Sequence, residues 1–310
     1  MPAWTSYYLP QTIPEALDIL QNEAHSKVIA GGTDLLLELQ QGRHAPVRTL
    51  VDLSAIAELQ KLEISEEMLW IGAGVPLNRV VAWQPTRQFA TALFEAASLI
   101  GGPQVRNVAT LGGNVAHALP AADGAIALLA LDAQVVLATP EGQRTQPLLA
   151  CYAGPGKTAL QRTEIILAFQ VPKSKPGEAS AFRRVMRPQG VAIAIQNMGI
   201  WLRREDDRIR EIRIAIGPAG PVPFRAHQTE STLHDKPLND KTLREAEQTL
   251  QAEARFRTSP HRATSEYRYH LAGILLRQTL QTAWERTQAN LEQEQLPLSV
   301  KGSGNHGTNG

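Results

Sequence analysis

The stretch Ala109-Thr110-Leu111-Gly112-Gly113-Asn114-Val115 decides the fold, because it joins an apolar, helix-like run at residues 88–100 and a link at 101–107 to the next part of the chain. Two adjacent glycines allow backbone angles that a β-carbon forbids, and they let the backbone approach a bulky anion closely. Bare N–H groups with short polar side chains on either side suit a phosphate or pyrophosphate. Taken alone, such a turn is most simply a connection between a helix and the next element.

A second double glycine has the same setting. Gly31 and Gly32 lie between a short apolar strand at residues 27–30 and a helix at 35–41. Thr33 and Asp34 are both reasonable N-caps for that helix. Neither turn has the Gly-x-Gly-x-x-Gly spacing of a Rossmann unit. Two separate loops can instead hold one diphosphate from both sides.

Four further runs accompany the two turns: Pro103-Gln104-Val105-Arg106-Asn107, Pro120-Ala121-Ala122-Asp123, Gly154-Pro155-Gly156-Lys157-Thr158 and Ser265-Glu266-Tyr267-Arg268. In this order they resemble the FAD-binding medium subunit of the molybdenum hydroxylases, the xanthine dehydrogenase and aerobic carbon monoxide dehydrogenase enzymes. The resemblance covers residues 5–285, which is nearly the whole folded chain.

The resemblance implies an α+β fold. A two-part α/β FAD-binding domain of the PCMH (vanillyl-alcohol oxidase-like) type is expected at residues 1–175, with its parts at 1–55 and 56–175. A sheet-and-helix domain of the CO dehydrogenase flavoprotein C-terminal type is expected at 178–288. The polar stretch 292–310 cannot bury a core and is expected to be a disordered tail.

Within the C-terminal domain the pattern predicts strands at residues 191–202 and 209–216 around a solvated, charged hairpin tip at 203–208. Alternating isoleucines in the second strand indicate a sheet with one buried face. Helices are predicted at 243–256 and 265–287. Ser265 is the expected cap of the second helix, and Leu271, Ile274 and Leu275 are its expected buried stripe.

FAD is expected to lie extended between the units, with its pyrophosphate held by both glycine turns. The residues expected to bind it are Ala30, Gly31, Gly32, Thr33, Asp34, Thr110, Gly112, Gly113, Asn114, Asp123 and Lys157. Asp34 is expected to act through its backbone, because its carboxylate would repel a diphosphate. Asp123 has the position of an N-cap, and the resemblance implies that it also accepts a hydrogen bond from a sugar or ribityl hydroxyl.

Lys157 belongs to a Gly-Lys-Thr run that also ends a nucleotide-binding P-loop. That motif needs a glycine five positions before Gly156, where Cys151 stands, and a helix directly afterwards. A strand-like run at residues 164–169 comes instead, so the kinase or ATPase hypothesis fails. The resemblance implies a lysine-threonine segment close to the flavin, and a merely solvated lysine is the alternative.

The arginines near these motifs have two interpretations each. Arg106 and Asn107 are expected to brace the central loop or its approach to a partner subunit. Arg183, Arg184 and Arg187 precede the C-terminal sheet and either face the flavin edge or form a surface cluster, of which the surface cluster is favoured.

Composition limits the other possibilities. The chain has 310 residues and a net charge of +1, so a nucleic-acid partner has no general electrostatic support. Its single cysteine excludes an internal disulfide and a cysteine-ligated cluster within this chain. No apolar run reaches membrane-spanning length, and no secretory signal is recognised, so a cytoplasmic protein is expected. Eight scattered histidines show no metal-ligand spacing.

The resemblance therefore implies a flavoprotein electron-transfer subunit. Molybdopterin and [2Fe-2S] clusters would belong to a large molybdopterin subunit and a small iron–sulfur subunit, in a dimer of heterotrimers. The link at 101–107 and the tail are the segments first considered for docking. Two alternatives remain open: a stand-alone FAD oxidase or reductase of the same fold, and an assembly protein that has lost its cofactor.

Overall fold

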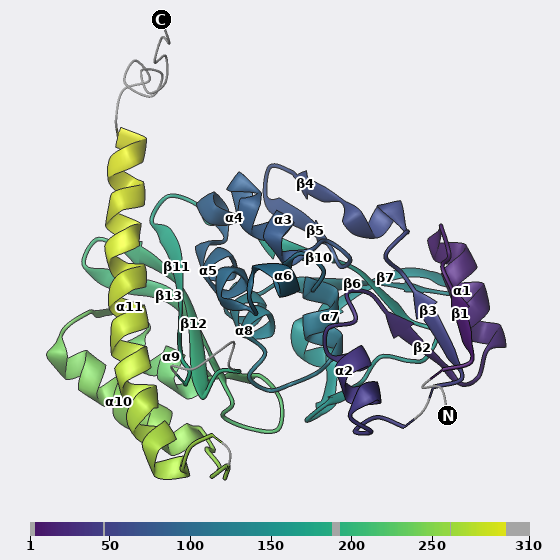
Figure 1. Cartoon of the computed structure of the whole chain (residues 1–310). Coiled ribbons are helices and arrows are strands. Elements are labelled where there is room, and N and C mark those ends of the chain that lie inside the picture. Colours follow the sequence, from purple (N-terminus) through teal and green to yellow (C-terminus); the bar gives the residue numbers. More distant parts are fainter. Residues whose placement is uncertain (1–3, 46, 188–192, 261, 296–310) are drawn as a thin grey trace, which may run out of the picture.

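The computed structural model of the chain describes residues 4–45, 47–187, 193–260 and 262–295. An N-terminal lobe, a central lobe and a C-terminal sheet with its helices succeed one another across the molecule (Figure 1). The expected α+β class is confirmed, because both strands and helices contribute to each of the three parts.

The N-terminal lobe is built on a small parallel sheet. Its strands are β1 (Ser6–Tyr8), β2 (Ser26–Ile29) and β3 (Thr49–Asp52), in the order β1-β3-β2. They are connected through α1 (Ile13–Asn22) and α2 (Leu35–Gln40). Thr12 caps α1 by accepting a hydrogen bond from the Glu15 N–H at 3.3 Å. Strand β1 is absent from the sequence-based expectations, since three residues are too few to show a period.

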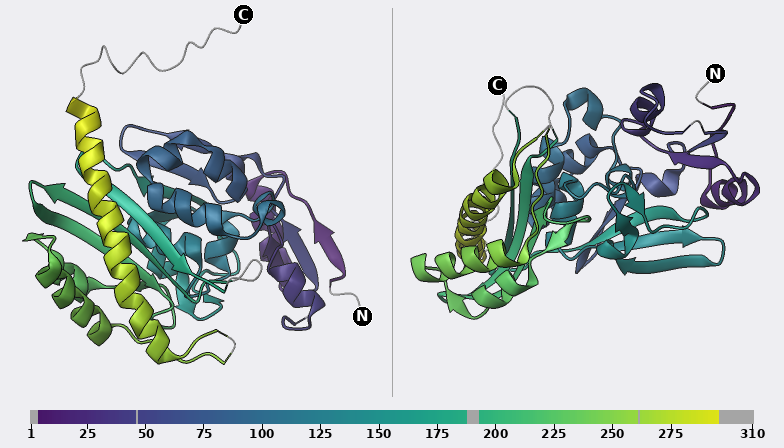
Figure 2. Two further views of the ribbon diagram at one scale, coloured as in Figure 1. Left: turned by 60° about the vertical axis from the view of Figure 1, so that its left-hand side comes forward. Right: turned by 90° about the horizontal axis from the view of Figure 1, so that it is seen from below.

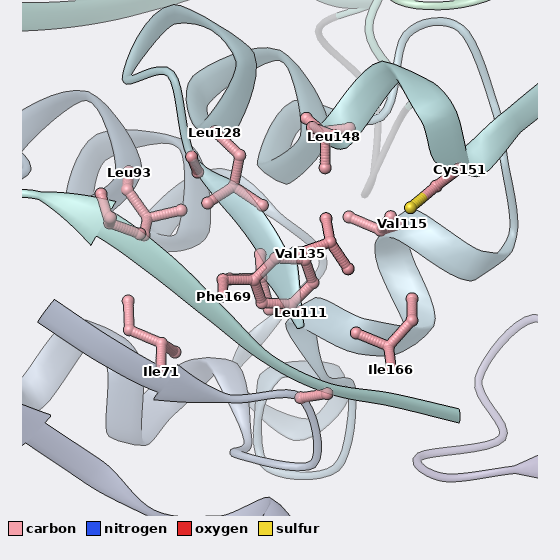
Figure 3. Close-up of a cluster of buried hydrophobic side chains, with 14 of the residues drawn as sticks. Ile71, Leu93, Leu111, Val115, Leu128, Val135, Leu148, Cys151, Ile166 and Phe169 are labelled. Atoms are coloured by element: carbon pink, nitrogen blue, oxygen red, sulfur yellow. The ribbon is translucent and has the colours of Figure 1, made fainter. Parts of the chain in front are cut away.

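The central lobe contains an antiparallel sheet in the order β4-β5-β10-β6-β7. Its strands are β4 (Leu62–Ile64), β5 (Met68–Gly72), β6 (Gln134–Thr139), β7 (Gly142–Pro147) and β10 (Ile165–Pro172). Side chains from this sheet and from the helices meet around the fully buried Phe169 of β10 (Figure 3). Strand β10 lies in the middle of the sheet, between β5 and β6, and its apolar side chains are mostly buried.

Six helices complete the described central lobe: α3 (Leu77–Ala82), α4 (Gln84–Phe89), α5 (Thr91–Leu99), α6 (Pro103–Arg106), α7 (Leu111–Ala116) and α8 (Asp123–Ala130). The 3-10 turns η1 (Ala57–Gln60) and η2 (Leu148–Cys151) and the strands β8 (Tyr152–Gly154) and β9 (Lys157–Thr158) fill the connections. The predicted link at 101–107 thus contains a short helix of its own.

The C-terminal sheet is antiparallel. It comprises β11 (Glu178–Val185), β12 (Gln196–Glu205), β13 (Arg208–Gly217), β14 (Phe224–Arg225) and β15 (Lys236–Pro237). One face carries α9 (His227–Leu233), α10 (Asp240–Glu253) and α11 (Ser265–Gln295), and α5 and α8 of the central lobe pack against the other (Figure 2). The sheet is therefore buried between two helical layers.

The single helix predicted at residues 88–100 is wrong, because the chain breaks at Ala90. Ala90 has φ −139° and ψ 52°, which ends α4 and starts α5. The Ala92 N–H at the start of α5 donates to Ser180 Oγ of β11 at 3.0 Å. A serine from a distant strand thus satisfies a donor that a continuous helix would have used internally, which a local pattern cannot reveal.

Further strand and helix boundaries differ from the predictions. Strand β12 runs to Glu205 and β13 begins at Arg208, so the hairpin tip predicted at 203–208 is reduced to Asp206 and Asp207, and α10 ends at Glu253 instead of 256. The strand predicted at 191–202 begins at Gln196, and residues 188–192 lie outside the described residues. Helix α10 begins at Asp240, three residues before the predicted start, because Asn239 and Thr242 form a capping box.

Helix α11 departs from the prediction at both ends. Thr264, not Ser265, caps it by accepting a hydrogen bond from the Tyr267 N–H at 3.2 Å. Leu271 and Leu275 are buried as expected, whereas Ile274 is 37% exposed. The helix continues to Gln295, so the first residues of the predicted tail are helical, and residues 296–310 lie outside the described part.

Glu95 of α5 connects three elements across the junction of the central lobe and the C-terminal sheet. One carboxylate oxygen accepts from the Phe182 N–H of β11 at 2.7 Å, and the other accepts from Arg286 of α11 at 2.5 Å. Arg286 also donates to the Ser180 carbonyl at 2.8 Å. This carboxylate therefore holds the C-terminal sheet between its two helical layers.

Replacing Glu95 by Ala is expected to lower the free energy of unfolding by about 1–3 kcal/mol, since two donors lose their acceptor. Urea titration followed by circular dichroism measures this. Glu66→Ala, at an exposed carboxylate, is the control and should change stability by less than about 0.5 kcal/mol. Equal midpoints for the two variants would contradict the role given to Glu95.

Candidate functional site

The first double-glycine turn connects β2 to α2. Gly32 has φ +67°, a left-handed conformation that favours glycine. The backbone N–H groups of Gly32, Thr33 and Asp34 have no hydrogen-bond partner among the described residues. Asp34 occupies the N-cap position of α2, but its side chain makes no capping bond. A short run of free backbone donors thus lies at this turn.

The second double glycine is the first turn of α7 rather than a loop. Thr110 is its N-cap and accepts a hydrogen bond from the Gly113 N–H at 3.0 Å. The Gly112 N–H donates to the Ala73 carbonyl at 3.0 Å. Two of the N–H groups that the sequence offered for an anion are therefore used inside the protein.

The two turns touch each other. A β-carbon on Gly31 would lie 2.1 Å from the Val108 carbonyl oxygen and 2.9 Å from Ala109 Cα, so only glycine fits this contact. A β-carbon on Gly112 would lie 2.6 Å from the Ala73 oxygen. Packing within the protein alone accounts for these two glycines.

Gly113 differs from the other glycines of the two turns. It is exposed, and a β-carbon there would meet only Thr110 Oγ1, at 3.2 Å. The described packing therefore does not require a glycine at this position.

Asn114 and Asp123 connect the second turn to the C-terminal sheet. Asn114 Oδ1 accepts from the Ala125 N–H at 3.2 Å and so caps α8. Asp123 is the first residue of α8, not its N-cap as predicted, because the N-cap position falls on Ala122. Its carboxylate is buried and accepts from Arg184 Nη1 at 2.5 Å and Asn197 Nδ2 at 2.6 Å.

The environment of Asp123 combines opposing effects on its charge. Burial raises the pKa of the carboxyl, and the Arg184 charge and the hydrogen bonds from Asn197 and Arg184 oppose that rise. Arg184 Nε and Asn197 Oδ1 are buried without a partner among the described residues. The surface cluster favoured for the arginines is thus wrong for Arg184, whose side chain is only 7% exposed, while Arg183 and Arg187 are exposed.

Lys157 lies apart from the turns. Its side chain is exposed on β9, and the neighbouring Gly156 N–H donates to the carbonyl of Ala118 at 3.0 Å. This contact is beyond the C-terminal end of α7, whereas the double glycine lies in the first turn of that helix. A position of Lys157 close to the flavin stays a prediction.

Side chains around the turns brace them. Arg106 donates to the carbonyls of Gly101 at 2.7 Å and Ile100 at 3.3 Å and to Asn78 Oδ1 at 3.3 Å. Asn78 also donates to Asn107. The bracing role predicted for Arg106 and Asn107 is confirmed.

Several of these partners were not predictable from local motifs. His117 Nε2 lies 3.6 Å from Glu38 of α2 and links the N-terminal and central lobes. Asn197 faces Arg184 across the β11–β12 pair, and only the strand register reveals this. Asn78 stands in a short helix with no motif of its own.

Other kinds of site find no support in the described part of the chain. Its residues contain no group of three or more His, Cys, Asp or Glu side chains that could hold a metal ion. Among the same residues, no helix is both long enough and apolar enough to cross a membrane.

Comparisons with known proteins agree with this architecture. Residues 3–174 match the family described as FAD binding domain in molybdopterin dehydrogenase, and residues 180–283 match the CO dehydrogenase flavoprotein C-terminal domain. The xanthine dehydrogenase FAD-binding subunit of Escherichia coli O157:H7 is 33% identical over 90% of this chain and 96% of its own length.

The carbon monoxide dehydrogenase medium chain of Hydrogenophaga pseudoflava is 29% identical over 92% of this chain and 99% of its own. A solved structure of carbon monoxide dehydrogenase from that organism superposes with a TM-score of 0.88 at 28% identity, and covers 92% of this chain and 99% of the other.

The fold and the paired turns define an FAD-binding subunit of an oxidoreductase. The chain belongs to the molybdenum hydroxylase family of xanthine and carbon monoxide dehydrogenases, as their FAD-binding subunit.

The residues present fit FAD in three respects. Free N–H groups at Gly32, Thr33 and Asp34 can meet phosphate oxygens. The adjoining turn exposes Gly113, where no β-carbon blocks approach. Unpartnered polar atoms of Arg184 and Asn197 lie beside Asp123, where hydroxyl groups can satisfy them.

Gly31→Ala is expected to lower the free energy of unfolding by about 1–3 kcal/mol, because the new methyl group would overlap the Val108 carbonyl and push the two turns apart. Urea unfolding of the purified variant measures the loss. Gly220→Ala, where a β-carbon would make only an ordinary contact with the Val222 oxygen at 3.9 Å, serves as the control and should leave the midpoint unchanged. An unchanged midpoint for Gly31→Ala would disprove the tight contact between the turns.

Proposed function

We propose that this chain is the electron-transfer flavoprotein subunit of a multi-subunit molybdenum hydroxylase. The observation that supports this most is the direct contact of the two double-glycine turns at Gly31 and Val108, beside free backbone donors. A diphosphate bound there would meet both lobes at once. The family membership supplies the identity of the ligand, FAD.

The residues proposed to hold FAD are those expected from the sequence. Backbone groups from Ala30 to Asp34 and the Thr33 hydroxyl would face the diphosphate. The α7 turn would contribute through Thr110, Gly112, Gly113 and Asn114, mainly by close approach, because two of its N–H groups are already used. Asp123 would accept from a hydroxyl, and Lys157, whose neighbour Gly156 contacts Ala118 beyond the C-terminal end of α7, would lie close to the flavin rather than to the diphosphate.

When bound, FAD supplies the redox chemistry by taking up electrons singly from an iron–sulfur centre and delivering them in pairs. The chain's own residues bind and orient the cofactor. Arg184 and Asn197 keep the Asp123 carboxylate in one orientation through their hydrogen bonds. Arg106 keeps the link before α7 in place. Such rigid support is what a site needs to hold a cofactor reproducibly.

The proposed partners are a small iron–sulfur subunit and a large molybdopterin subunit, in a dimer of heterotrimers. The single, buried Cys151 cannot hold an iron–sulfur cluster, so electrons must come from another chain. The segment at 101–107 remains a proposed docking element, while most of the tail lies outside the described residues. A cytoplasmic location also stays a prediction.

Two alternative functions are compatible with the same fold. A stand-alone FAD oxidoreductase would need substrate-binding catalytic residues of its own, and an assembly protein would not bind the cofactor. The free donors at the first turn argue against the assembly protein, and an absorbance spectrum separates it from the others.

Gly113→Val is expected to abolish FAD binding while the chain stays folded. A β-branched side chain would stand where the backbone is to meet phosphate, yet it meets only Thr110 Oγ1 inside the protein. Flavin content per chain and the circular dichroism spectrum check both parts. Gly220→Val is the control and should keep its flavin. Wild-type flavin affinity in Gly113→Val would exclude the α7 turn as the diphosphate site.

The purified chain should carry one non-covalent FAD that acid precipitation releases, since no histidine or cysteine of a recognised attachment motif stands at the site. A chemical reductant should bleach this flavin. The isolated chain should not oxidise purines, aldehydes or carbon monoxide. Substrate turnover by the isolated, metal-free chain, assayed with an artificial acceptor dye, would show that the division of labour between subunits is wrong.

A further inference from the structure

Three arginines gather before and in the first turn of α11 without a carboxylate partner among the described residues. The loop that carries Arg257 and Arg262 is folded back on itself, since the Ser265 N–H donates to Thr258 Oγ1 at 3.0 Å and the Ser259 N–H to the Ala263 carbonyl at 2.9 Å. Arg268 comes next, in α11. The neighbouring charges that lower the pKa of Arg268, after burial, are those of Arg262 and Arg257.

Arg268 is the innermost of the three. Its side chain is among the largest fully buried ones of the chain, at 2% exposure. Nη1 donates to the Ile195 carbonyl at the start of β12, and Nε has no partner in the described part of the chain. A buried cation normally has an anionic partner, because removing its hydration is costly. Among the described residues no carboxylate forms an ion pair with it, and residues 188–192 and 261 contain no Asp or Glu.

Large apolar side chains are exposed next to Arg268 and to the chain segments that it contacts. Ile193 is 53% exposed and lies two residues before Ile195, whose carbonyl Arg268 binds. Met186 is 38% exposed and comes directly after Val185, whose carbonyl accepts from the Ile195 N–H at 2.8 Å. Tyr267 is 45% exposed and precedes Arg268. Arginine, tyrosine and methionine are the residue types enriched at protein interfaces.

This surface adjoins the proposed cofactor site. Asn197, two residues after Ile195 on β12, donates to Asp123 at 2.6 Å. Arg184 Nη2 donates to the Met186 sulfur atom at 3.1 Å, and Arg184 is also the ion-pair partner of Asp123. A protein that docked here would lie next to β11 and β12, the strands that bind Asp123 at the start of α8.

We propose that Arg257, Arg262, Met186, Ile193 and Tyr267, here called the α11 docking surface, bind an acidic face of the iron–sulfur subunit. The proposal rests on the proposed function and adds the place of contact. Arg257 and Arg262 pair with carboxylates of the partner, and the buried charge of Arg268 adds to the positive potential. A protein partner is favoured over a free anion, because three exposed apolar side chains flank the charges and a small anion would leave them uncovered.

The test uses the full, FAD-loaded chain and the iron–sulfur subunit of its complex, with binding measured by biolayer interferometry at about 50 and 300 mM salt. The double variant Arg257→Glu, Arg262→Glu should weaken binding at least about tenfold at low salt and lose most of its salt dependence. Ile193→Ser should weaken binding at both salt concentrations alike. Flavin content and circular dichroism verify folding, and Arg257→Gln, Arg262→Gln replaces the double variant if it does not fold.

Two exposed residues elsewhere provide matched controls. Arg244→Glu on α10 makes the same charge change, and Ile64→Ser on β4 makes the same apolar change at 49% exposure. Both should bind as wild type does. Wild-type affinity in the arginine and Ile193 variants overturns the docking surface while leaving the proposed function intact. If the wild-type chain itself does not bind the iron–sulfur subunit, the partner assignment fails and the docking surface fails with it.

Discussion

Helix α8 has no side that faces solvent, so both the central lobe and the C-terminal sheet must pack against it. All eight of its residues are buried, including Asp123 and Gly124. A helix that is buried all round needs a partner on every side. The central lobe covers one side and strands β12 and β13 cover the other. The close approach favours glycine in the sheet, because a β-carbon on Gly199 of β12 would lie 3.1 Å from Ala130 Cβ and 3.2 Å from the Ile126 oxygen of α8.

The amino end of α8 adds an electrostatic requirement to this packing. A buried carboxylate is costly unless it is paired, and breaking such a pair strands a charge. Arg184 and Asn197, from two neighbouring strands of the C-terminal sheet, supply the partners of Asp123. Asn114 of α7 caps the same end through the Ala125 N–H. The second glycine turn, α8 and the C-terminal sheet are therefore one hydrogen-bonded unit, and their positions are coupled.

The candidate site was only partly predictable. Both double glycines and Asp123 follow from short motifs, because a glycine pair and an acidic residue at a helix start have local meanings. The use of the Gly112 N–H inside the protein was not visible, since its acceptor Ala73 lies in another part of the chain. Burial of Arg184 was also hidden, because its counter-charge is 61 residues away. Sequence patterns report on neighbours along the chain, and these contacts are between distant segments.

The sequence by itself determined the two glycine turns and the strand-like run that forms β10, because each depends on residues close together in the chain, and the order of several such motifs gave the resemblance that implied the α+β class. Tertiary structure alone decided that the turns meet at Gly31 and Val108, that the helix breaks at Ala90, and that Arg184 and Arg268 are buried. Packing brings together residues far apart in sequence, and the energy of a buried charge or a backbone contact depends on which distant group arrives beside it.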